Sequence, residues 1–290
     1  MTAAFALALL SLDGVGRVTA HRILERFPAL EDVRAAPLEQ VLLRLKGAPN
    51  AERTVGALRD LSFDAAVEQM RERVQGLEGK RVHVLARGDE AWPTGLDALE
   101  RSDRPVVLYA FGDLGALAWP SLSILAGAPL EAEPFEAAQR VAGRALELGR
   151  GLVVGAAHGV DLALQKMSLG AQLPAVAVAG SGLGRLERSM RPAATALTKA
   201  GGLLVSPFPM GHGPFDHDDR ERALVHAALG RAVLAVAPAA GSPEDRAAAW
   251  AIEAERPVAL VASQDATSRP SWAARALPAD DADAVAGLVA

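Results

Sequence analysis

The stretch GLVVGAAHGVDLALQKMSLG, residues 151–170, passes from a short apolar run through two glycines into a helical pattern. Such an order is typical of a strand, a tight turn and a helix in a parallel sheet. His158 lies in the turn. Asp161 falls in the first helical turn, where a carboxylate can cap free N–H groups or face a ligand. This unit therefore predicts both a fold class and a candidate site.

The same rhythm continues on both sides of this stretch. Helical patterns at 134–148, 160–169, 191–200, 218–229 and 243–254 separate short β-branched runs, which read RVHVLA, PVVLYA, SLSILAG, GLVVG, PAVAVAG, GGLLVSP, RAVLAVAP and RPVALVA. Strands that alternate with helices imply right-handed crossovers. The sequence thus predicts an α/β fold with a Rossmann-like, mostly parallel sheet over residues 79–265.

Residues 1–78 instead alternate helical patterns with glycine turns, which predicts an all-helical module of the helix-hairpin-helix (SAM-like) type. Its segment LDGVGRVTAHRIL, residues 12–24, places Gly14 and Gly16 before a helix that begins with Arg17. The backbone N–H groups of such a hairpin can hold a DNA phosphate, although the hairpin can also serve packing alone. The tail, residues 266–290, is predicted to be a linker with a short C-terminal helix.

Composition narrows the function classes. The chain has 290 residues, a net charge of −5, no cysteine and 4% aromatic residues. A negative net charge gives no global attraction for nucleic acid, so phosphate binding would need a local patch. The lack of cysteine fits a reducing compartment, and no apolar run reaches about 18 residues. We expect a soluble, cytoplasmic protein with no membrane association.

Glycine-rich turns follow several predicted strands, at the sheet edge where parallel sheets bind ligands. Tight turns need glycine in any case, but several turns at one edge favour a pocket. We expect backbone amides and arginines to gather there and to hold an anion. Arg185, Arg188 and Arg191 recur every three residues, so one helical turn would present all three, unless they form only a solvated face. The candidate phosphate-binding residues of this edge are Gly127, Gly155, His158, Gly159, Asp161, Gly180, Ser181, Gly182, Arg185, Arg188, Arg191 and Arg222.

The sequence gives little support for a metal site or a catalytic site. The histidines are scattered without metal-ligand spacing, and His212 and His217 with their neighbouring aspartates fit a solvated loop better than a cation site. No G-x-S-x-G elbow occurs. We assign no catalytic residue, no metal site and no cofactor.

Several motifs in chain order resemble the DNA-processing protein A (DprA, or Smf) family. They are Trp92-Pro93 with Leu96, Leu108-Tyr109 with Gly112, the turns 155–161 and 177–184, and residues 203–209. The resemblance implies a cytosolic, non-enzymatic homodimer that binds single-stranded DNA and helps to load a RecA-type recombinase in recombination, transformation or repair. It also implies that His158 occupies the position of a pocket-lining arginine.

The sequence departs from that family at basic positions. Residues 127–129 read GAP where the family has GSR, Gln165 replaces a histidine, and residues 221–224 read ERAL in place of RRNR. Fewer phosphate contacts predict weaker DNA binding with a shallow salt dependence. Two alternatives stay open: a nucleotide-ligand binding protein of the Rossmann-like sensor or phosphoribohydrolase-like group, and a degenerate paralogue that acts by dimerisation.

Overall fold

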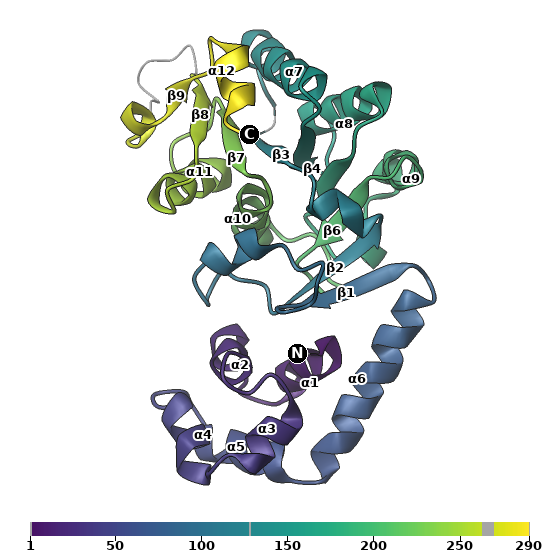
Figure 1. The fold of residues 1–290 in the computed structure, drawn as a ribbon, viewed down its shortest axis with the longest axis vertical. Helices are drawn as coiled ribbons and strands as arrows, with labels where there is room; N and C mark the ends of the chain where they lie inside the picture. Colours follow the sequence, from purple (N-terminus) through teal and green to yellow (C-terminus); the bar gives the residue numbers. More distant parts are fainter. Residues whose placement is uncertain (1, 128, 263–269, 290) are drawn as a thin grey trace. The chain divides into compact units, whose positions relative to one another are not determined.

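The computed structural model describes residues 2–127, 129–262 and 270–289 (Figure 1). The chain forms two units, Met1–Trp92 with Glu100–Tyr109 and Pro93–Leu99 with Ala110–Ala290, which we describe separately. The predicted position of Ala128 in a turn and the predicted boundary between 265 and 266 lie outside the described residues.

The first unit is mainly helical. Thr2 caps its first helix, since the Thr2 hydroxyl accepts a hydrogen bond from the N–H of Phe5. Phe5, Leu9 and Ile23 are fully buried and form part of the core of this unit. The elements are α1 (Ala3–Ser11), α2 (Arg17–Leu24), α3 (Leu30–Ala35), α4 (Leu38–Arg44), α5 (Ala51–Arg59), α6 (Ser62–Glu78), β1 (Val82–Ala86) and the first half of β2 (Val107–Gly112).

The apolar pattern over residues 51–75 would suit one continuous helix, but the chain forms two helices there, α5 and α6. Asp60 ends α5 in an extended conformation, and its carboxylate accepts a hydrogen bond from the N–H of Ser62, the first residue of α6. This side-chain contact satisfies a backbone donor that a continuous helix would have paired internally.

The second unit contains a parallel sheet, as the sequence predicts. Its strands follow the order β6-β5-β4-β3-β7-β8-β9, and β3 pairs in parallel with β4 on one side and β7 on the other. The chain moves from β3 towards β6 and then returns to β7, so the direction of the connections reverses beside β3. The strands are β3 (Ser121–Ala126), β4 (Gly151–Gly155), β5 (Ala175–Val178), β6 (Leu203–Ser206), β7 (Ala232–Val236), β8 (Val258–Val261) and β9 (Leu277–Pro278).

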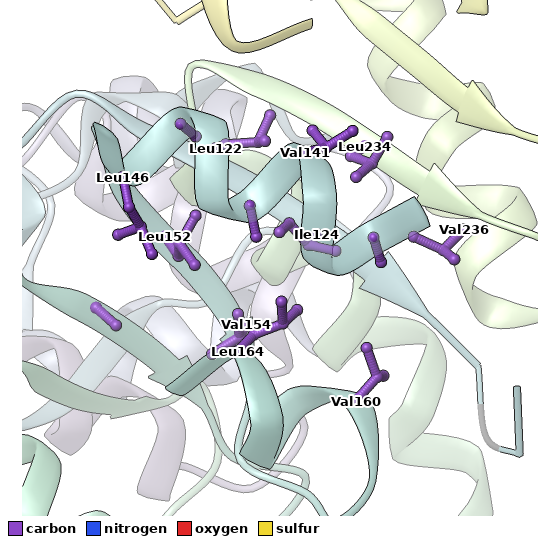
Figure 2. Packing of buried hydrophobic residues seen from close by; sticks show 14 of the residues in the cluster. Leu122, Ile124, Val141, Leu146, Leu152, Val154, Val160, Leu164, Leu234 and Val236 are labelled. Carbon is purple, nitrogen blue, oxygen red and sulfur yellow. The ribbon is translucent and has the colours of Figure 1, made fainter. Parts of the chain in front are cut away.

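Helices cover both faces of this sheet. Figure 2 shows Leu122, Leu152 and Leu234, from three neighbouring strands, beside Val141 and Leu146 of α7. A buried hydrophobic cluster lies on this face, and α7, α8, α9 and α12 all contribute to it. The opposite face carries α10 and α11. The helices are α7 (Ala132–Glu147), α8 (Val160–Ala171), α9 (Arg191–Lys199), α10 (Asp219–Leu229), α11 (Pro243–Glu253) and α12 (Ala282–Gly287).

The tail is more than a linker. Leu277 and Pro278 form β9, which pairs in parallel with β8, and the N–H of Ala279 donates to the carbonyl of Leu260. Val285 and Ala286 of α12 are fully buried in the cluster on α7. The described part of the tail, residues 270–289, therefore completes the sheet edge and the core, a role that a two-residue strand does not signal in a sequence.

Candidate nucleic-acid interface

A cavity of about 900 Å³ lies at the carboxyl ends of the central strands of the second unit. The turns after β3, β4, β5 and β7 line it together with the starts of α10 and α11. This is the position at which an open parallel sheet binds ligands, beside the strand where the connections reverse. The predicted residues that line the cavity are Gly127, His158, Asp161, Gly180, Ser181, Arg185 and Arg222.

Asp161 and Gln165 clamp the end of β4. Asp161 Oδ1 accepts a hydrogen bond from the N–H of Gly155 at 2.8 Å, and Gln165 Nε2 donates to the Gly155 carbonyl at 2.8 Å. The two side chains are four residues apart on α8 and so share one face. A Cβ at Gly155 would collide with the Asp161 carboxylate. Gly155 is therefore needed for this close approach, and Asp161 ties the helix to the strand.

The environment of Asp161 perturbs its titration. The residue is 5% exposed. Burial raises the pKa of the Asp161 carboxyl to about 6, while the Gly155 hydrogen bond and the Arg222 guanidinium act to lower it and Glu244 to raise it. A carboxylate held in this way is a poor partner for a phosphate, because both are anionic.

The N-terminus of α8 opens beside the same cavity. Its N-cap, Gly159, has φ +76°, and no described side chain caps the helix there. Ala157, His158 and Val160 line the cavity around this turn. The first N–H groups of a helix have no partner within the helix, and they bind anions well. The turn therefore presents backbone N–H groups near the cavity, although Gly159 itself is outside the lining.

The charge of the cavity differs from the expected rim of arginines. Among the described lining residues, two arginines, Arg185 and Arg222, meet five carboxylates, which are Asp161, Glu187, Asp216, Asp219 and Glu244. Arg222 lies 3.2 Å from Glu244 Oε1 and 3.2 Å from Asp219 Oδ1. Its charge is thus balanced within the protein, and the cavity as a whole is acidic.

The three arginines that follow β5 do not share one helical turn, so that prediction is wrong. Two short 3₁₀ turns, Leu183–Arg185 and Arg188–Met190, are separated by extended backbone at Leu186 and Glu187. Leu186 and Met190 point inward and are buried. Arg185 therefore lines the cavity, whereas Arg188 and Arg191 are exposed outside its lining.

His158 contacts two residues that follow β5, Ser189 and Glu187. Its Nε2 lies 2.9 Å from the Ser189 hydroxyl, which in turn donates to the Glu187 carboxylate. His158 Nε2 is also 3.7 Å from Glu187 Oε1. At this position the side chain offers a polar ring rather than the fixed positive charge of an arginine.

An aromatic stack lies at the cavity and was not predicted from the sequence. Phe208 stacks on His212 at 5.0 Å between ring centroids, the rings of His212 and Phe215 are nearly perpendicular at 5.1 Å, and Phe215 stacks on His217 at 5.4 Å. Asp218 fixes His212 at 2.8 Å. Phe215 is 52% exposed and lines the cavity. The feature of the sequence that could have indicated this stack is the recurrence of aromatic rings between residues 208 and 217.

The remaining predicted residues have other places. In the first unit, Gly14 has φ +79°, Gly16 is the N-cap of α2, and Arg17 Nη1 donates to the Ser102 carbonyl at 3.0 Å. In the second unit, the N–H of Gly182 donates to the His212 carbonyl at 2.9 Å, and a Cβ at Gly182 would collide with the Pro209 carbonyl. Gly182 therefore packs two loops together beside the cavity.

The described residues contain neither a group suited to bind a metal ion nor a helix suited to cross a membrane. None of their groups of histidine, aspartate and glutamate has the arrangement to hold a metal ion. Among the helices of residues 2–127, 129–262 and 270–289, none has the length and apolarity that a membrane crossing requires.

This chain is similar to known proteins in both sequence and structure. A family model described as DNA recombination-mediator protein A matches residues 83–288. The structure of DNA processing protein A from Streptococcus pneumoniae is similar with a TM-score of 0.70 and 19% identity, over 95% of this chain and 92% of that chain. The structure of DNA processing protein A from Helicobacter pylori is similar with a TM-score of 0.59 and 18% identity, over 71% of this chain and 94% of that chain. Its description refers to a single-stranded DNA binding mode. The comparison with curated proteins gives no match.

Proposed function

The chain belongs to the DNA recombination-mediator protein A family, and from this membership we propose that it binds single-stranded DNA in the cavity of the second unit. The similar Helicobacter pylori protein is described as binding single-stranded DNA, which supports the proposal. The cavity lies where this fold places ligands.

The observation that carries the proposal is the pairing of two features in one cavity. The uncapped N-terminus of α8 supplies N–H donors for a phosphate, and the exposed ring of Phe215 supplies a surface on which a base can stack. Stacking is tolerant of sequence and is worth about 1–3 kcal/mol per base. Together these groups bind a nucleotide unit without depending on an arginine.

The acidic lining limits how strongly phosphate charge contributes. Arg185 is the cavity arginine that is exposed, since Arg222 is already balanced by Glu244 and Asp219. Each phosphate neutralised on a single strand contributes about −0.7 to the salt slope. We therefore expect weak binding with a shallow slope.

Fluorescence anisotropy with a labelled oligo-dT tests the proposal. The variant Phe215→Ala should weaken binding about tenfold, in line with the loss of one stacked base. The matched control is Trp119→Ala, because Trp119 is also an exposed aromatic residue of the second unit but precedes β3, at the other end of the strand. Absence of binding by the wild type, or equal binding by Phe215→Ala, would refute the proposal.

We propose further, on the family alone, that the protein acts without catalysis, as a cytoplasmic homodimer that assists a RecA-type recombinase. Sedimentation of the purified protein tests the dimer, and a strand-exchange assay on oligo-dT-containing substrate tests the assistance. A monomer at all concentrations, or no change in recombinase loading, would overturn the corresponding part.

A second candidate function is the binding of a free nucleotide. The cavity volume of about 900 Å³ lies within the range of small-molecule sites, and carboxylates such as Asp216 and Asp219 can accept hydrogen bonds from ribose hydroxyls. Thermal melting with nucleotides and with oligo-dT separates the two functions. Stabilisation by a nucleotide with no effect of oligo-dT would favour the second.

A further inference from the structure

A second hollow, of about 320 Å³, lies in the helical first unit. Three parts of that unit meet there: α2 with the two residues after its end, the last turn of α4, and the segment that begins at Glu100. We call it the arginine pocket. The residues that line it are Arg22, Glu25, Arg26, Leu43, Arg44 and Arg101.

The single carboxylate of the arginine pocket is already occupied. Arg101 donates to both oxygens of Glu25, through Nε at 3.0 and 3.1 Å and through Nη2 at 2.6 Å. Arg104 and Arg87 lie 3.5 and 3.7 Å from Glu25 Oε1. The hydrogen bond from Arg101 lowers the pKa of the Glu25 carboxyl, so the group is ionised and shared among three guanidiniums.

The other arginines of the pocket keep their charge available. Arg22 Nη1 donates to the Lys46 carbonyl at 3.2 Å, and Arg22 has no carboxylate partner in the part of the chain that the structure describes. Arg26 and Arg44 are exposed, and neither has an ion pair or a side-chain hydrogen bond among the described residues. Four guanidiniums thus face one carboxylate, although residues 1–80 as a whole contain equal numbers of acidic and basic residues.

We propose that the arginine pocket binds a terminal phosphate group, either at the 5′ end of a DNA strand or on a free nucleotide. Guanidinium groups match phosphate oxygens with paired, charge-assisted hydrogen bonds. A terminal phosphate carries close to two negative charges and exposes three oxygens, whereas a phosphodiester carries one charge and exposes two. Arginines that approach from three parts of the unit therefore favour the terminal group.

The proposal is independent of the cavity in the second unit. Five of the six lining residues precede residue 83, where the family match begins. The pocket also differs from the hairpin at Gly14 and Gly16, where the possible donors are backbone N–H groups.

Titration calorimetry with inorganic pyrophosphate tests the site on the full chain. The variant combines Arg26→Gln and Arg44→Gln, which removes two charges that hold no partner in the described structure, so folding should be preserved. The control combines Arg53→Gln and Arg71→Gln, an equal charge change at exposed residues of the same unit outside the pocket. We expect the pocket variant to lose about tenfold or more in affinity and the control to lose less than about twofold.

Oligo-dT with and without a 5′ phosphate identifies the source of the ligand. Tighter binding of the phosphorylated strand by the wild type, lost in the pocket variant, assigns a strand end. Equal binding of both strands, with pyrophosphate binding still lost in the variant, assigns a free nucleotide. If the wild type does not bind pyrophosphate, or if the pocket variant and the control bind it equally, the proposal is wrong.

Discussion

The cavity of the second unit and the arginine pocket of the first unit have opposite arrangements of charge. In the cavity of the second unit, one arginine, Arg222, is held between Glu244 and Asp219. In the arginine pocket of the first unit, one carboxylate, Glu25, is held by Arg101 with Arg104 and Arg87 nearby. The comparison shows that an arginine near a site is informative only when its counter-charges are known. Arg222 is paired with carboxylates in the cavity, whereas Arg26 and Arg44 can bind an anion in the arginine pocket.

The largest expected effect concerns the clamp that makes Asp161 a structural group. Gly155→Ala would drive a Cβ into the buried Asp161 carboxylate, so we expect a loss of about 3 kcal/mol or more in the free energy of unfolding. Gly170→Ala is the control, because Gly170 lies in α8 with open space around it and should gain up to about 1 kcal/mol. Urea denaturation measures both. Equal stabilities would mean that Asp161 is free to serve a ligand.

The pH dependence of stability sharpens the same point. Asp161 has a folded pKa of about 6 against 3.8, so its contribution is full below pH 3.8 and is lost as the pH rises to 6. His226 is fully buried, and burial lowers its pKa from 6.5 to about 4, so its contribution is present above pH 6.5 and is lost as the pH falls to 4. The two slopes oppose each other between pH 4 and 6.

Single substitutions should separate these slopes. In Asp161→Asn, the stability should rise with pH across this window, by roughly 2 kcal/mol more than in the wild type, because the opposing contribution of Asp161 is removed while that of His226 remains. In His226→Gln, it should fall by a similar amount. Denaturation at half-unit pH steps tests this, with the wild type as the reference. Parallel profiles for both variants would contradict the assigned burial of these groups.

A matched pair of substitutions tests the comparison directly. Arg222→Gln leaves Glu244, whose side chain is 9% exposed, without its partner, and should cost about 2–3 kcal/mol of stability. Arg101→Gln removes a guanidinium that is half exposed and leaves Arg104 and Arg87 near Glu25, so it should cost about 1 kcal/mol or less. Glu25→Gln should bind pyrophosphate a few times more tightly. Equal costs for the two arginine substitutions would remove the distinction between the hollows.

Much of the fold could be predicted from local patterns. The eight apolar runs became strands β1–β8, and the helices at 134–148 and 243–254 appear as α7 and α11 with ends shifted by two residues or fewer. These patterns suffice because a buried strand and an amphipathic helix are each encoded within a short window. β9 was missed, since two residues carry no period.

The candidate site was predicted only in part, because it is made by residues from distant parts of the chain. The turns that follow the strands could be placed, as at Gly127 and Gly180, since parallel strands end at the same edge. The carboxylates that approach from α10 and α11, such as Asp219 and Glu244, could not, because helix faces are not fixed by sequence spacing alone. The stack at Phe215 depends likewise on how a loop folds back.

The most direct test of the central claim is the salt dependence of oligo-dT binding by the Arg26→Gln, Arg44→Gln variant, in which the arginine pocket is weakened. Backbone donors and stacking in an acidic cavity predict a slope of log K against log salt of about −1, and a further Arg188→Glu, Arg191→Glu change should leave it unaltered. A slope of about −3 or steeper, or one that Arg188 and Arg191 control, would show that the DNA is held by a basic surface and not by the cavity.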